Sequence, residues 1–450
     1  MRPLSRLVLT VVTFSLIGGM ATPAMSHDLP SVGPEVETPA LFDDEAGHNA
    51  NGDDPAIWLH PSQSGKSVVI TTAKEGGLFV YDLDGRQLQH FPAPAAPGPD
   101  DEPGRFNNVD VTYGFGGRDL AVVSDRGRDI LRIYAISGGR LTDVTDPAAP
   151  FVFNATQQEV NEAQTAYGLT TWKDSTGTYA LVSRRHKTSV GLVKLLQGPG
   201  GTVGYQLVRT LDLPASFTLP NGQTWTPCME PGELAQVEGM VVDQERDVLY
   251  AAQEDVGIWR MRADLTGTPV LMDKVREYGV PGSYDPETEE CTPGADPGYG
   301  GRHLSADAEG LTIYYREDGK GYLMASSQGD GTFAVYRREG SNAHLRQFRI
   351  GQDDGIDGVE NSDGSAVLNV PMGDFDEGLF VAHDGANTPA VPDRENTNFK
   401  FTGWGDIAEE LDLDVDTDGW DPRDREPKPG QATRAPVSGG AAHPRAPPPG

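Results

Sequence analysis

Acidic residues that lie far apart in the sequence share one local context, because each stands at or near the start of a short apolar run. Asp53 precedes PAIWL, Glu238 stands in VEGMVVD, and Asp307 and Glu309 stand in DAEGLTIYY. If these runs bring their carboxylates to one place, the groups cannot all stay ionised without a counter-ion, so we expect raised pKa values or bound cations. The expected cluster comprises Asp53, Glu238, Glu254, Asp307, Glu309 and Asp363.

The ligand types in this cluster favour calcium. All of them are oxygen donors, and the sequence has no His/Cys spacing typical of zinc sites. The run GQDDGIDGVENSDG at residues 351–364 combines flexible glycines with close carboxylates, and we prefer Asp357 and Asp363 as its ligands. Across the chain, 67 acidic residues against 36 basic ones give a net charge of −31. That charge repels nucleic acid and anionic membranes, so we expect neither as a partner.

Basic residues stand in polar turns in the first half of the chain, namely Lys74, Arg126 and Arg184. Facing several metal ions, these side chains would form a cavity that is positive on all sides and captures phosphate esters. A metal-activated water could then attack phosphorus directly, with no covalent enzyme intermediate. The sequence also lacks other nucleophile motifs, since SRRHKTS at residues 183–189 is not RHGxRxP and neither G-x-S-x-G nor H-E-x-x-H is present.

Each of these residues also has a simpler interpretation. An acidic side chain beside a turn can serve only to hydrogen-bond to the local backbone, and a lone cation in a loop is usually solvated. The DVDTDG stretch at residues 414–419 imitates the start of an EF-hand loop, but its twelfth position is Arg425 rather than Glu, so we interpret it as a solvated segment or a weak ion site. The catalytic hypothesis therefore requires that all these candidate side chains lie together at one place in the folded protein.

The elements that must position these residues recur six times. One series consists of hairpins, in which two apolar runs flank a polar turn, although the sixth hairpin shows only its first half. A series of short strands precedes the hairpins one by one, at intervals of roughly 50–75 residues, as in repeated propeller blades. The hairpins span residues 68–81, 120–134, 179–195, 249–261, 322–336 and 379–385, and the preceding strands span residues 53–59, 107–115, 166–172, 237–243, 307–315 and 362–370.

Two series of six in step predict an all-β fold, a six-bladed β-propeller. A two-sheet sandwich would not explain why the series run together. Equivalent turns of a propeller emerge at the same end, so the basic turns of the first three blades and the acidic strand starts of the last three would share one channel mouth. Helical periodicity is limited to a short candidate at Trp404, Ile407 and Leu411.

The two ends of the chain differ from this repeat. Two arginines precede an apolar run at residues 7–20, and we interpret residues 1–26 as a cleaved signal peptide. The run is shorter than the ~20 residues of a membrane-spanning helix, so we expect a secreted, extracellular protein. Residues 424–450 are rich in Pro, Gly and Ala and are predicted to be disordered, which leaves residues 27–423 as a single propeller domain.

The chain has two cysteines, Cys228 and Cys291. In an exported protein such a pair is more often a disulfide than a site, so we predict that the two are bonded. Both lie in stretches rich in Pro and Gly, at residues 216–234 and 274–301, which look like loop insertions held together by the bond. No long apolar surface helix or exposed edge strand is evident, and we expect a monomer.

Seven segments, in the same order, resemble the signature segments of the β-propeller phytases. The likeness runs from about residue 50 to residue 423, through DDPAIWLHP (53–61), NNVDVTYGF (107–115), VEGMVVD (237–243), DAEGLTIYY (307–315), GKGYLMASSQG (319–329), GLFVAHDG (378–385) and NTNFKFTGW (396–404). The resemblance implies a six-bladed propeller with structural calcium ions and further calcium ions at the channel mouth. It also implies the activity of a 3-phytase, with calcium-complexed phytate as the substrate and two neighbouring phosphates bound.

The resemblance assigns roles to residues by motif. The expected catalytic residues are Asp53, Glu238, Lys74 and Arg126, and the expected phosphate-binding residues are Lys74, Arg126, Tyr167 and Arg184. The expected metal ligands are Asp53, Asp54, Glu238, Glu254, Asp307, Glu309, Gln328, Asp357 and Asp363. The chain departs from the family pattern at two points, since many members have a second lysine where Glu75 stands and a lysine where Arg184 stands.

Two other functions stay open from the sequence. Six-bladed propellers with channel calcium also include calcium-dependent lactonases or esterases, although such sites usually need one metal ion and fewer cations than Lys74, Arg126 and Arg184 would provide. A propeller could also bind a partner protein and use calcium only for structure, because a fold alone does not determine a function.

Overall fold

The computed structural model describes residues 29–423, except residues 48, 289, 389–390, 392–393 and 418–419. The expected signal peptide (1–26) and the expected tail (424–450) lie outside the described residues. Strands dominate the described part of the chain, and its two α-helices are short. These helices are α1 (Gln157–Val160) and α2 (Trp404–Leu411), and four 3-10 segments span Ser64–Lys66, Pro199–Gly201, Glu317–Gly319 and Gln328–Asp330.

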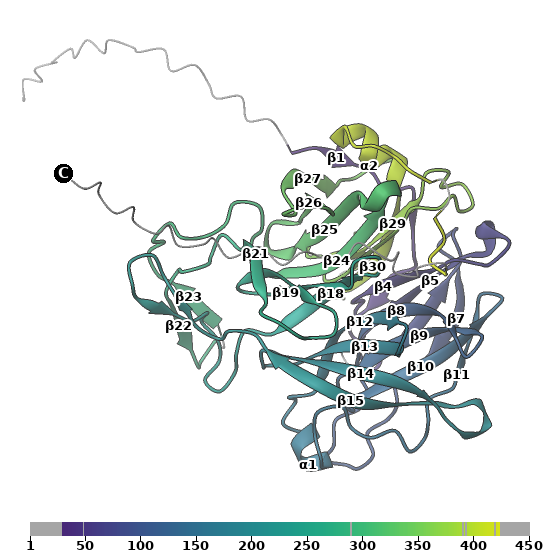
Figure 1. Ribbon diagram of the computed structural model, residues 1–450, viewed down its shortest axis with the longest axis horizontal. Helices are drawn as coiled ribbons and strands as arrows, with labels where there is room; N and C mark the ends of the chain where they lie inside the picture. Colours follow the sequence, from purple (N-terminus) through teal and green to yellow (C-terminus); the bar gives the residue numbers. More distant parts are fainter. Residues whose placement is uncertain are drawn as a thin grey trace, which may run out of the picture.

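Six sheets of successive strands surround a central axis, which confirms the predicted six-bladed β-propeller (Figure 1). Within each blade the strands pair antiparallel in chain order. From the first blade to the sixth, the strands are β4 (Pro55–Trp58), β5 (Val68–Thr72), β6 (Leu78–Tyr81) and β7 (Gln87–Phe91); β8 (Phe106–Phe115), β9 (Arg118–Asp125), β10 (Ile130–Ser137) and β11 (Arg140–Asp143); β12 (Ala166–Asp174), β13 (Gly177–Arg184), β14 (Ser189–Gln197) and β15 (Val203–Asp212); β18 (Val237–Asp243), β19 (Val248–Gln253), β20 (Gly257–Arg262) and β21 (Val270–Lys274); β24 (Ala308–Tyr315), β25 (Gly321–Ser327), β26 (Thr332–Arg337) and β27 (His344–Ile350); and β28 (Ser365–Leu368), β29 (Leu379–Asp384) and β30 (Asn396–Gly403).

The first strand of each blade lies innermost, beside the first strands of the neighbouring blades. These inner strands match the short strands that precede the hairpins in the sequence. The second half of the sixth hairpin, which the sequence pattern did not reveal, is β30, and it pairs with β29 across an intervening loop. All six repeats therefore contain the expected three strands.

The N-terminal segment closes the ring of blades. Strand β1 (Ser31–Val32) pairs parallel with β27 at the edge of the fifth blade. Strands β2 (Val36–Glu37) and β3 (Leu41–Phe42) both pair antiparallel with β30 and so complete the sixth blade. Because residues 31–42 pair with strands of two adjacent blades, the N-terminal segment joins the fifth blade to the sixth.

Apolar side chains fill the spaces between neighbouring blades. Ile70 and Val80 of the first blade, for example, belong to one buried cluster with Val109 and Val123 of the second. Each sheet has a neighbour on both faces, so its strands are buried on both sides and their sequences are short, nearly continuous apolar runs. This burial fixes the blades and leaves the strand ends free to carry polar side chains.

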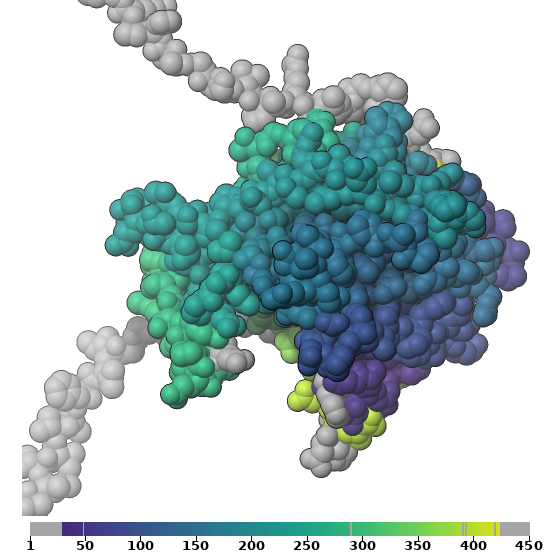
Figure 2. All heavy atoms as spheres, turned by 90° about the horizontal axis from the view of Figure 1, so that it is seen from below, coloured from purple at the N-terminus to yellow at the C-terminus, as the bar shows by residue number. Residues whose placement is uncertain are grey.

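Two extra hairpins interrupt the regular order of strands and form the predicted insertions. One pairs β16 (Phe217–Thr218) with β17 (Thr224–Trp225), and the other pairs β22 (Gly282–Asp285) with β23 (Glu290–Pro293). Cys228 and Cys291 are joined by a disulfide, with their Cα atoms 6.0 Å apart, which confirms the predicted bond. The segment around β22 and β23 projects from one side of the propeller (Figures 1 and 2). Among the described residues, no helix is long and apolar enough to cross a membrane.

Candidate active site at the channel mouth

The inner strands of four consecutive blades share one irregularity. In blades two to five, the pairing of the first strand with the second skips two residues, namely Asn107 and Asn108, Tyr167 and Gly168, Glu238 and Gly239, and Glu309 and Gly310. A β-bulge of this kind bends its strand and re-aims a side chain. Equivalent bulges therefore present Tyr167, Glu238 and Glu309 at the same end of the channel.

The glycines in these bulges allow neighbouring blades to approach closely. A Cβ atom on Gly168 would lie 2.0 Å from the carbonyl oxygen of Glu238, and one on Gly239 would lie 2.1 Å from the carbonyl oxygen of Glu309. Both distances are far shorter than van der Waals contact, so only glycine fits at these two positions. The backbone of each site residue is thereby packed against the next blade.

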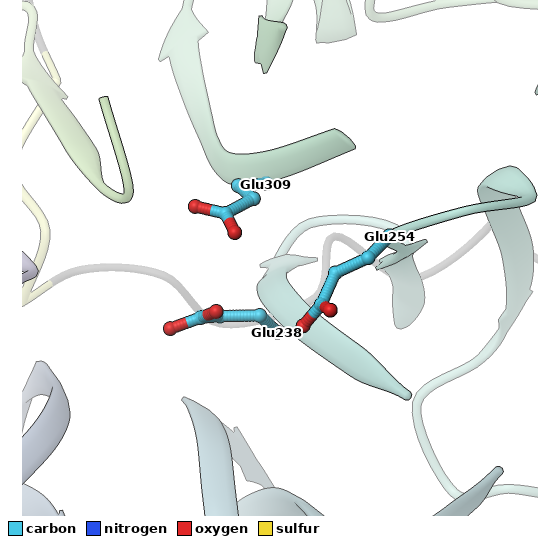
Figure 3. A group of neighbouring side chains, drawn as sticks. All are labelled: Glu238, Glu254 and Glu309. Carbon is cyan, nitrogen blue, oxygen red and sulfur yellow. The ribbon is translucent and has the colours of Figure 1, made fainter. Parts of the chain in front are cut away.

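Glu238, Glu254 and Glu309 form a compact group of carboxylates at this mouth (Figure 3). Each offers an oxygen within 4.8 Å of the oxygens of the other two, and all three residues are buried. Glu238 and Glu309 come from the bulges of β18 and β24, and Glu254 is the first residue after β19. Figure 3 shows the three side chains beside one another, with the carboxyl group of Glu254 extending toward Glu238. A dense group of oxygen donors is the ligand set that calcium prefers.

Burial dominates the electrostatics of this group. It raises the pKa of Glu238, Glu254 and Glu309, and the carboxylates around each group raise these pKa values further. A carboxyl group in such surroundings either keeps its proton or pairs with a cation. The acidic half of the mouth is therefore suited to hold positive charge.

Asp53 adds a buried oxygen that has no partner. The residue is 1% exposed, and its Oδ1 has no hydrogen-bond partner among the described residues. Its Oδ2 lies 3.8 Å from Nζ of Lys74. Burial raises the pKa of Asp53, and Glu238 raises it further. Buried polar atoms are rarely left without a partner, so this oxygen fits the donor set of a bound cation, and the residues present are compatible with calcium.

Asp363 links the acidic group to a protein cation. Lys74 Nζ lies 3.3 Å from Asp363 Oδ2, and Gln328 Nε2 donates hydrogen bonds to Asp363 Oδ1 at 2.5 Å and to Glu309 Oε2 at 3.2 Å. Burial alone would raise the pKa of Asp363, but Lys74 and His383 outweigh it and hold that pKa below its usual value. The negative charge of Asp363 is thus balanced in part by groups of the protein itself.

Glu238 connects the acidic half of the mouth to the basic half. Arg126 Nη1 donates to Asn107 Oδ1 at 2.8 Å, and Asn107 Nδ2 donates to Glu238 Oε1 at 2.7 Å. Tyr167 donates its hydroxyl proton to Glu238 Oε2 at 2.5 Å, and the guanidinium of Arg126 lies 5.4 Å from the centre of the Tyr167 ring. The structure therefore brings these expected residues from blades two, three and four together.

Arg184 is directed to a different place. It is the last residue of β13, and its Nε donates to the carbonyl oxygen of Gln164 at 2.9 Å while its Nη2 donates to Asn154 Oδ1 at 2.9 Å. Its guanidinium lies 5.7 Å from the ring centre of Phe153. These contacts hold the loop before β12, and the structure does not bring Arg184 to the carboxylates. Its expected role in phosphate binding stays a prediction.

The next residue, Arg185, occupies the position that Arg184 was expected to fill. It is the first residue after the second strand of its blade, as are Arg126, Glu254 and Gln328. Burial lowers the pKa of Arg185, and the nearby guanidinium of Arg126 lowers it further, while Tyr167 and Glu254 act in the opposite direction. The sequence analysis gave the phosphate-binding role in this turn to Arg184 and none to Arg185, although the shared position directly after the second strand is a signal that favours Arg185.

A second group of carboxylates adjoins the first and includes a residue not expected from the sequence. Glu254, Asp255 and Asp307 each offer an oxygen within 4.8 Å of the others. Burial raises the pKa of Asp255 to about 7, and Asp307 and Glu277 contribute to the rise. Glu277 also accepts a hydrogen bond from Ser305 Oγ at 2.9 Å. Asp255 directly follows Glu254 in the same polar turn, and this position is the sequence signal that could have identified it.

Two of the expected metal ligands lie apart from the mouth. Asp54 is buried, accepts a hydrogen bond from the backbone N–H of Val109 at 3.1 Å and lines a cavity of about 120 Å³ inside the channel. Asp357 forms an ion pair with the fully buried ammonium of Lys400 and accepts from the backbone N–H of Thr388 at 2.5 Å. In this structure Asp357 already has a protein cation as its partner, and its role as a calcium ligand stays a prediction.

Comparisons with known proteins found a matching family, a relative in sequence and distant matches among solved structures. The model of the phytase family matches residues 2–218 and 285–428. A 3-phytase from Bacillus subtilis (strain 168) is 36% identical over 391 residues, which cover 84% of each chain. Among solved structures, the calcium-binding protein regucalcin from Agrobacterium tumefaciens (11% identity, TM-score 0.42) covers 83% of this chain and 97% of its own, and virginiamycin B lyase from Staphylococcus aureus (12% identity, TM-score 0.35) covers 81% and 98%. The sequence matches show that the chain belongs to the phytase family and is a phosphatase.

Proposed function

We propose that this protein is a secreted, calcium-dependent phytase that hydrolyses phosphomonoesters of phytate. The observation that carries the proposal is the position of Glu238. One of its oxygens accepts from Tyr167 and the other from Asn107, and the same carboxylate lies within 4.8 Å of Glu254 and Glu309. A phosphate ester beside Glu238 would therefore meet the protein cations on one side and the cation-binding carboxylates on the other.

Calcium is the proposed cofactor because the two groups of neighbouring carboxylates at the site offer many oxygen donors, most of them buried. Buried carboxylates with raised pKa values and the unpartnered Asp53 Oδ1 support it. The residues that would hold the ions are Asp53, Glu238, Glu254, Asp307, Glu309, Gln328 and Asp363. Bound calcium would balance the negative charge on the phosphoryl oxygens and activate the water that attacks phosphorus.

Lys74 and Arg126 would contribute the fixed positive charge of the protein. Burial tends to lower the pKa of Lys74, but Asp363 and Asp53 more than compensate, so Lys74 stays protonated. Arg126 is 9% exposed, and Asn107 holds one end of its guanidinium. Cations preorganised in this way stabilise charge that develops on the equatorial oxygens of a transferring phosphoryl group.

Tyr167 would position Glu238. Burial and the adjacent Glu238 raise the pKa of Tyr167 well above its usual value, so its hydroxyl keeps the proton that it donates. Glu238 would then be held as an acceptor, with its second oxygen fixed by Asn107. We therefore assign Tyr167 and Asn107 to orienting the carboxylate rather than to proton transfer.

The disulfide supports the proposed secretion, because disulfides persist mainly in oxidising compartments. The apolar run at residues 7–20, which precedes the described residues, is consistent with export. The monomeric state stays a prediction.

Phosphate release from phytate tests the proposed function. Purified protein is assayed with calcium, with a chelator in place of calcium, and in parallel with a lactone substrate. We expect release only with calcium, loss of release in Glu238→Ala with an unchanged circular dichroism spectrum, and full release in the control Glu410→Ala, which changes an exposed residue of α2. Lactone turnover without phosphate release would indicate a lactonase, and inertness toward both substrates would indicate a binding propeller.

A further inference from the structure

The turn that follows β21 brings an acidic side chain, Glu277, to the edge of the mouth. Glu277 stands ahead of the hairpin β22–β23, in the stretch 274–301 that we interpret as an insertion, and outside both ranges that the phytase family model matches. The backbone N–H of Arg276 donates to the carbonyl oxygen of Leu304 at 2.8 Å. The turn is therefore fastened to the segment that leads into the inner strand β24, and this contact does not involve the hairpin.

Both carboxylate oxygens of Glu277 accept hydrogen bonds from the two residues ahead of Asp307. Oε1 accepts from the hydroxyl of Ser305 at 2.9 Å, and Oε2 accepts from the backbone N–H of Ala306 at 2.9 Å. Hydrogen bonds to a carboxylate are stronger than those between neutral groups. The side chain of Glu277 therefore holds the backbone from which Asp307 extends.

The same segment is held from its other side by the fifth blade. The backbone N–H of Ser305 donates to the hydroxyl of Ser327 at 2.8 Å. A Cβ atom on Gly329 would overlap the carbonyl oxygen of Ala306, so only glycine fits there and the two backbones pack closely. The two residues ahead of Asp307 thus lie between the turn after β21 and the end of β25.

Arg276, the residue before Glu277, contacts a second segment of the mouth. It forms an ion pair with Asp330, which ends the 3-10 segment that begins at Gln328. The backbone N–H of Gln328 in turn donates to the carbonyl oxygen of Asp307 at 2.9 Å. One turn therefore contacts the chain beside two residues that we propose as calcium ligands, Asp307 and Gln328.

The charge of Glu277 also acts on the second group of carboxylates, which comprises Glu254, Asp255 and Asp307. Burial raises the pKa of Asp307, and Asp363 and Glu277 raise it further. Burial, Asp307 and Glu277 likewise raise the pKa of Asp255. Glu277 therefore lies close enough to this group to make it more negative and more attractive to a cation.

We propose that Glu277 is a positioning residue, which holds the backbone ahead of Asp307 so that this carboxylate is preorganised to bind a cation at the mouth. The inference rests on the proposed function and extends it from the blades to a turn between two of them. Glu277 acts through Ser305 and Ala306 and contacts neither the cation nor the phosphate ester. Preorganised ligands bind more tightly because less ordering is needed on binding, so this turn sets the calcium concentration that the enzyme requires.

Calcium titration tests the proposal. Glu277→Ala, which changes an exposed residue, is compared with wild type by calorimetric titration of dialysed protein with calcium and by phosphate release from phytate over a range of calcium concentrations. The binding step that Glu238→Ala removes is assigned to the mouth. We expect the dissociation constant of this step and the calcium concentration for half-maximal release to rise about 10-fold, since two hydrogen bonds to a carboxylate are lost, with kcat at saturating calcium changed less than about twofold.

Asp174→Ala is the matched control. Asp174 also accepts from one hydroxyl and one backbone N–H of a turn, since Oγ1 and N of Thr176 both donate to its Oδ1 at 2.7 Å. It is the last residue of β12, at the opposite end of that strand from Tyr167. The variant removes the same charge away from the mouth, so its calcium binding should match wild type. A rise equal to that of Glu277→Ala would reduce the effect to net charge and overturn the proposal.

Ser305→Ala separates positioning from charge, and it tests the proposal alone should Glu277→Ala fail to fold. It removes one hydrogen bond of Glu277 and keeps the carboxylate, so the dissociation constant should rise several-fold. The double variant should match Glu277→Ala, because both residues act through one contact. A silent Ser305→Ala overturns the proposal. A lower melting temperature of Glu277→Ala in chelator, with unchanged calcium binding, would show a merely structural role and overturn it too.

The same measurements distinguish this inference from the proposed function. Should wild type bind calcium but release no phosphate from phytate, the proposed function fails, and the titration still decides the role of Glu277. A wild type that binds no calcium overturns both.

Discussion

The hydroxyl of Tyr167 and the carboxylate of Glu238 are joined by a hydrogen bond of 2.5 Å across the boundary between the third and fourth blades. Both residues stand on β-bulges of inner strands, and the glycine that follows Tyr167 packs against the backbone of Glu238. The contact depends on the propeller as a whole, because the two residues lie 71 positions apart in the chain.

Removing the Tyr167 hydroxyl should reduce activity without unfolding the protein. Tyr167→Phe keeps the ring but leaves Glu238 Oε2 without its donor, and a hydrogen bond to a charged group contributes about 1.5–3 kcal/mol. We expect kcat for phytate to fall about 10- to 100-fold with little change in melting temperature. Tyr205→Phe is the matched control, since its hydroxyl bonds to Pro150 and Leu131 away from the mouth. Full activity of Tyr167→Phe would contradict the positioning role.

A methyl group at Gly239 should disturb both the fold and the site. The added Cβ would lie 2.1 Å from the carbonyl oxygen of Glu309, so the fourth and fifth blades must separate. We expect Gly239→Ala to lower the free energy of unfolding by about 1–3 kcal/mol, as overpacking does, and to reduce phosphate release more than stability alone explains. In the control Gly65→Ala, the nearest atom would lie 3.8 Å from the new Cβ, so denaturant unfolding should match wild type. Equal stability of the two variants would show that the blades tolerate separation.

The sequence predicted the architecture and most of the mouth because both follow from position within a repeat. Inner strands and hairpins recur in step, so Lys74, Arg126, Glu254 and Gln328 could be placed at one end without coordinates. Which of two adjacent arginines faces the mouth depends on where β13 ends, and a run such as SRRHK does not reveal that.

The partner of Asp357 could not be predicted either. Lys400 stands in β30, which is the second half of the sixth hairpin and was not visible in the sequence pattern. The cation that pairs with Asp357 therefore lies outside the strands that the repeat predicted. In this structure a buried ammonium faces Asp357, whose role as a calcium ligand stays a prediction.

Loss of the disulfide should loosen the insertions and leave the mouth intact. The Cys228→Ser and Cys291→Ser double variant removes a cross-link between residues 63 positions apart, and disulfides typically contribute about 2–4 kcal/mol to the free energy of unfolding. We expect a loss of this size in denaturant unfolding, faster proteolysis between β15 and β24, and nearly unchanged phosphate release. Wild type treated with a reductant should behave in the same way. A large loss of activity would instead assign the insertions a direct role at the site.

His344 should make stability depend on pH. Burial lowers its pKa to about 4, below the usual value of about 6.5, so the unfolded chain binds a proton in this range that the folded protein does not. The contribution of neutral His344 is therefore complete above pH of about 6.5 and is lost as the pH falls toward 4. We expect the free energy of unfolding to fall over this window in wild type and to fall less steeply in His344→Gln, as measured by urea unfolding. Identical slopes would contradict this assignment.

Diffraction from crystals grown with calcium tests the central claim most directly. The account predicts anomalous peaks at the mouth, including an ion bound by oxygens of Glu238, Glu254 and Glu309 at about 2.3–2.6 Å, on the side opposite Lys74 and Arg126. Crystals that bind calcium elsewhere on the protein but show no ion among these three carboxylates, in a preparation that still hydrolyses phytate, would contradict it.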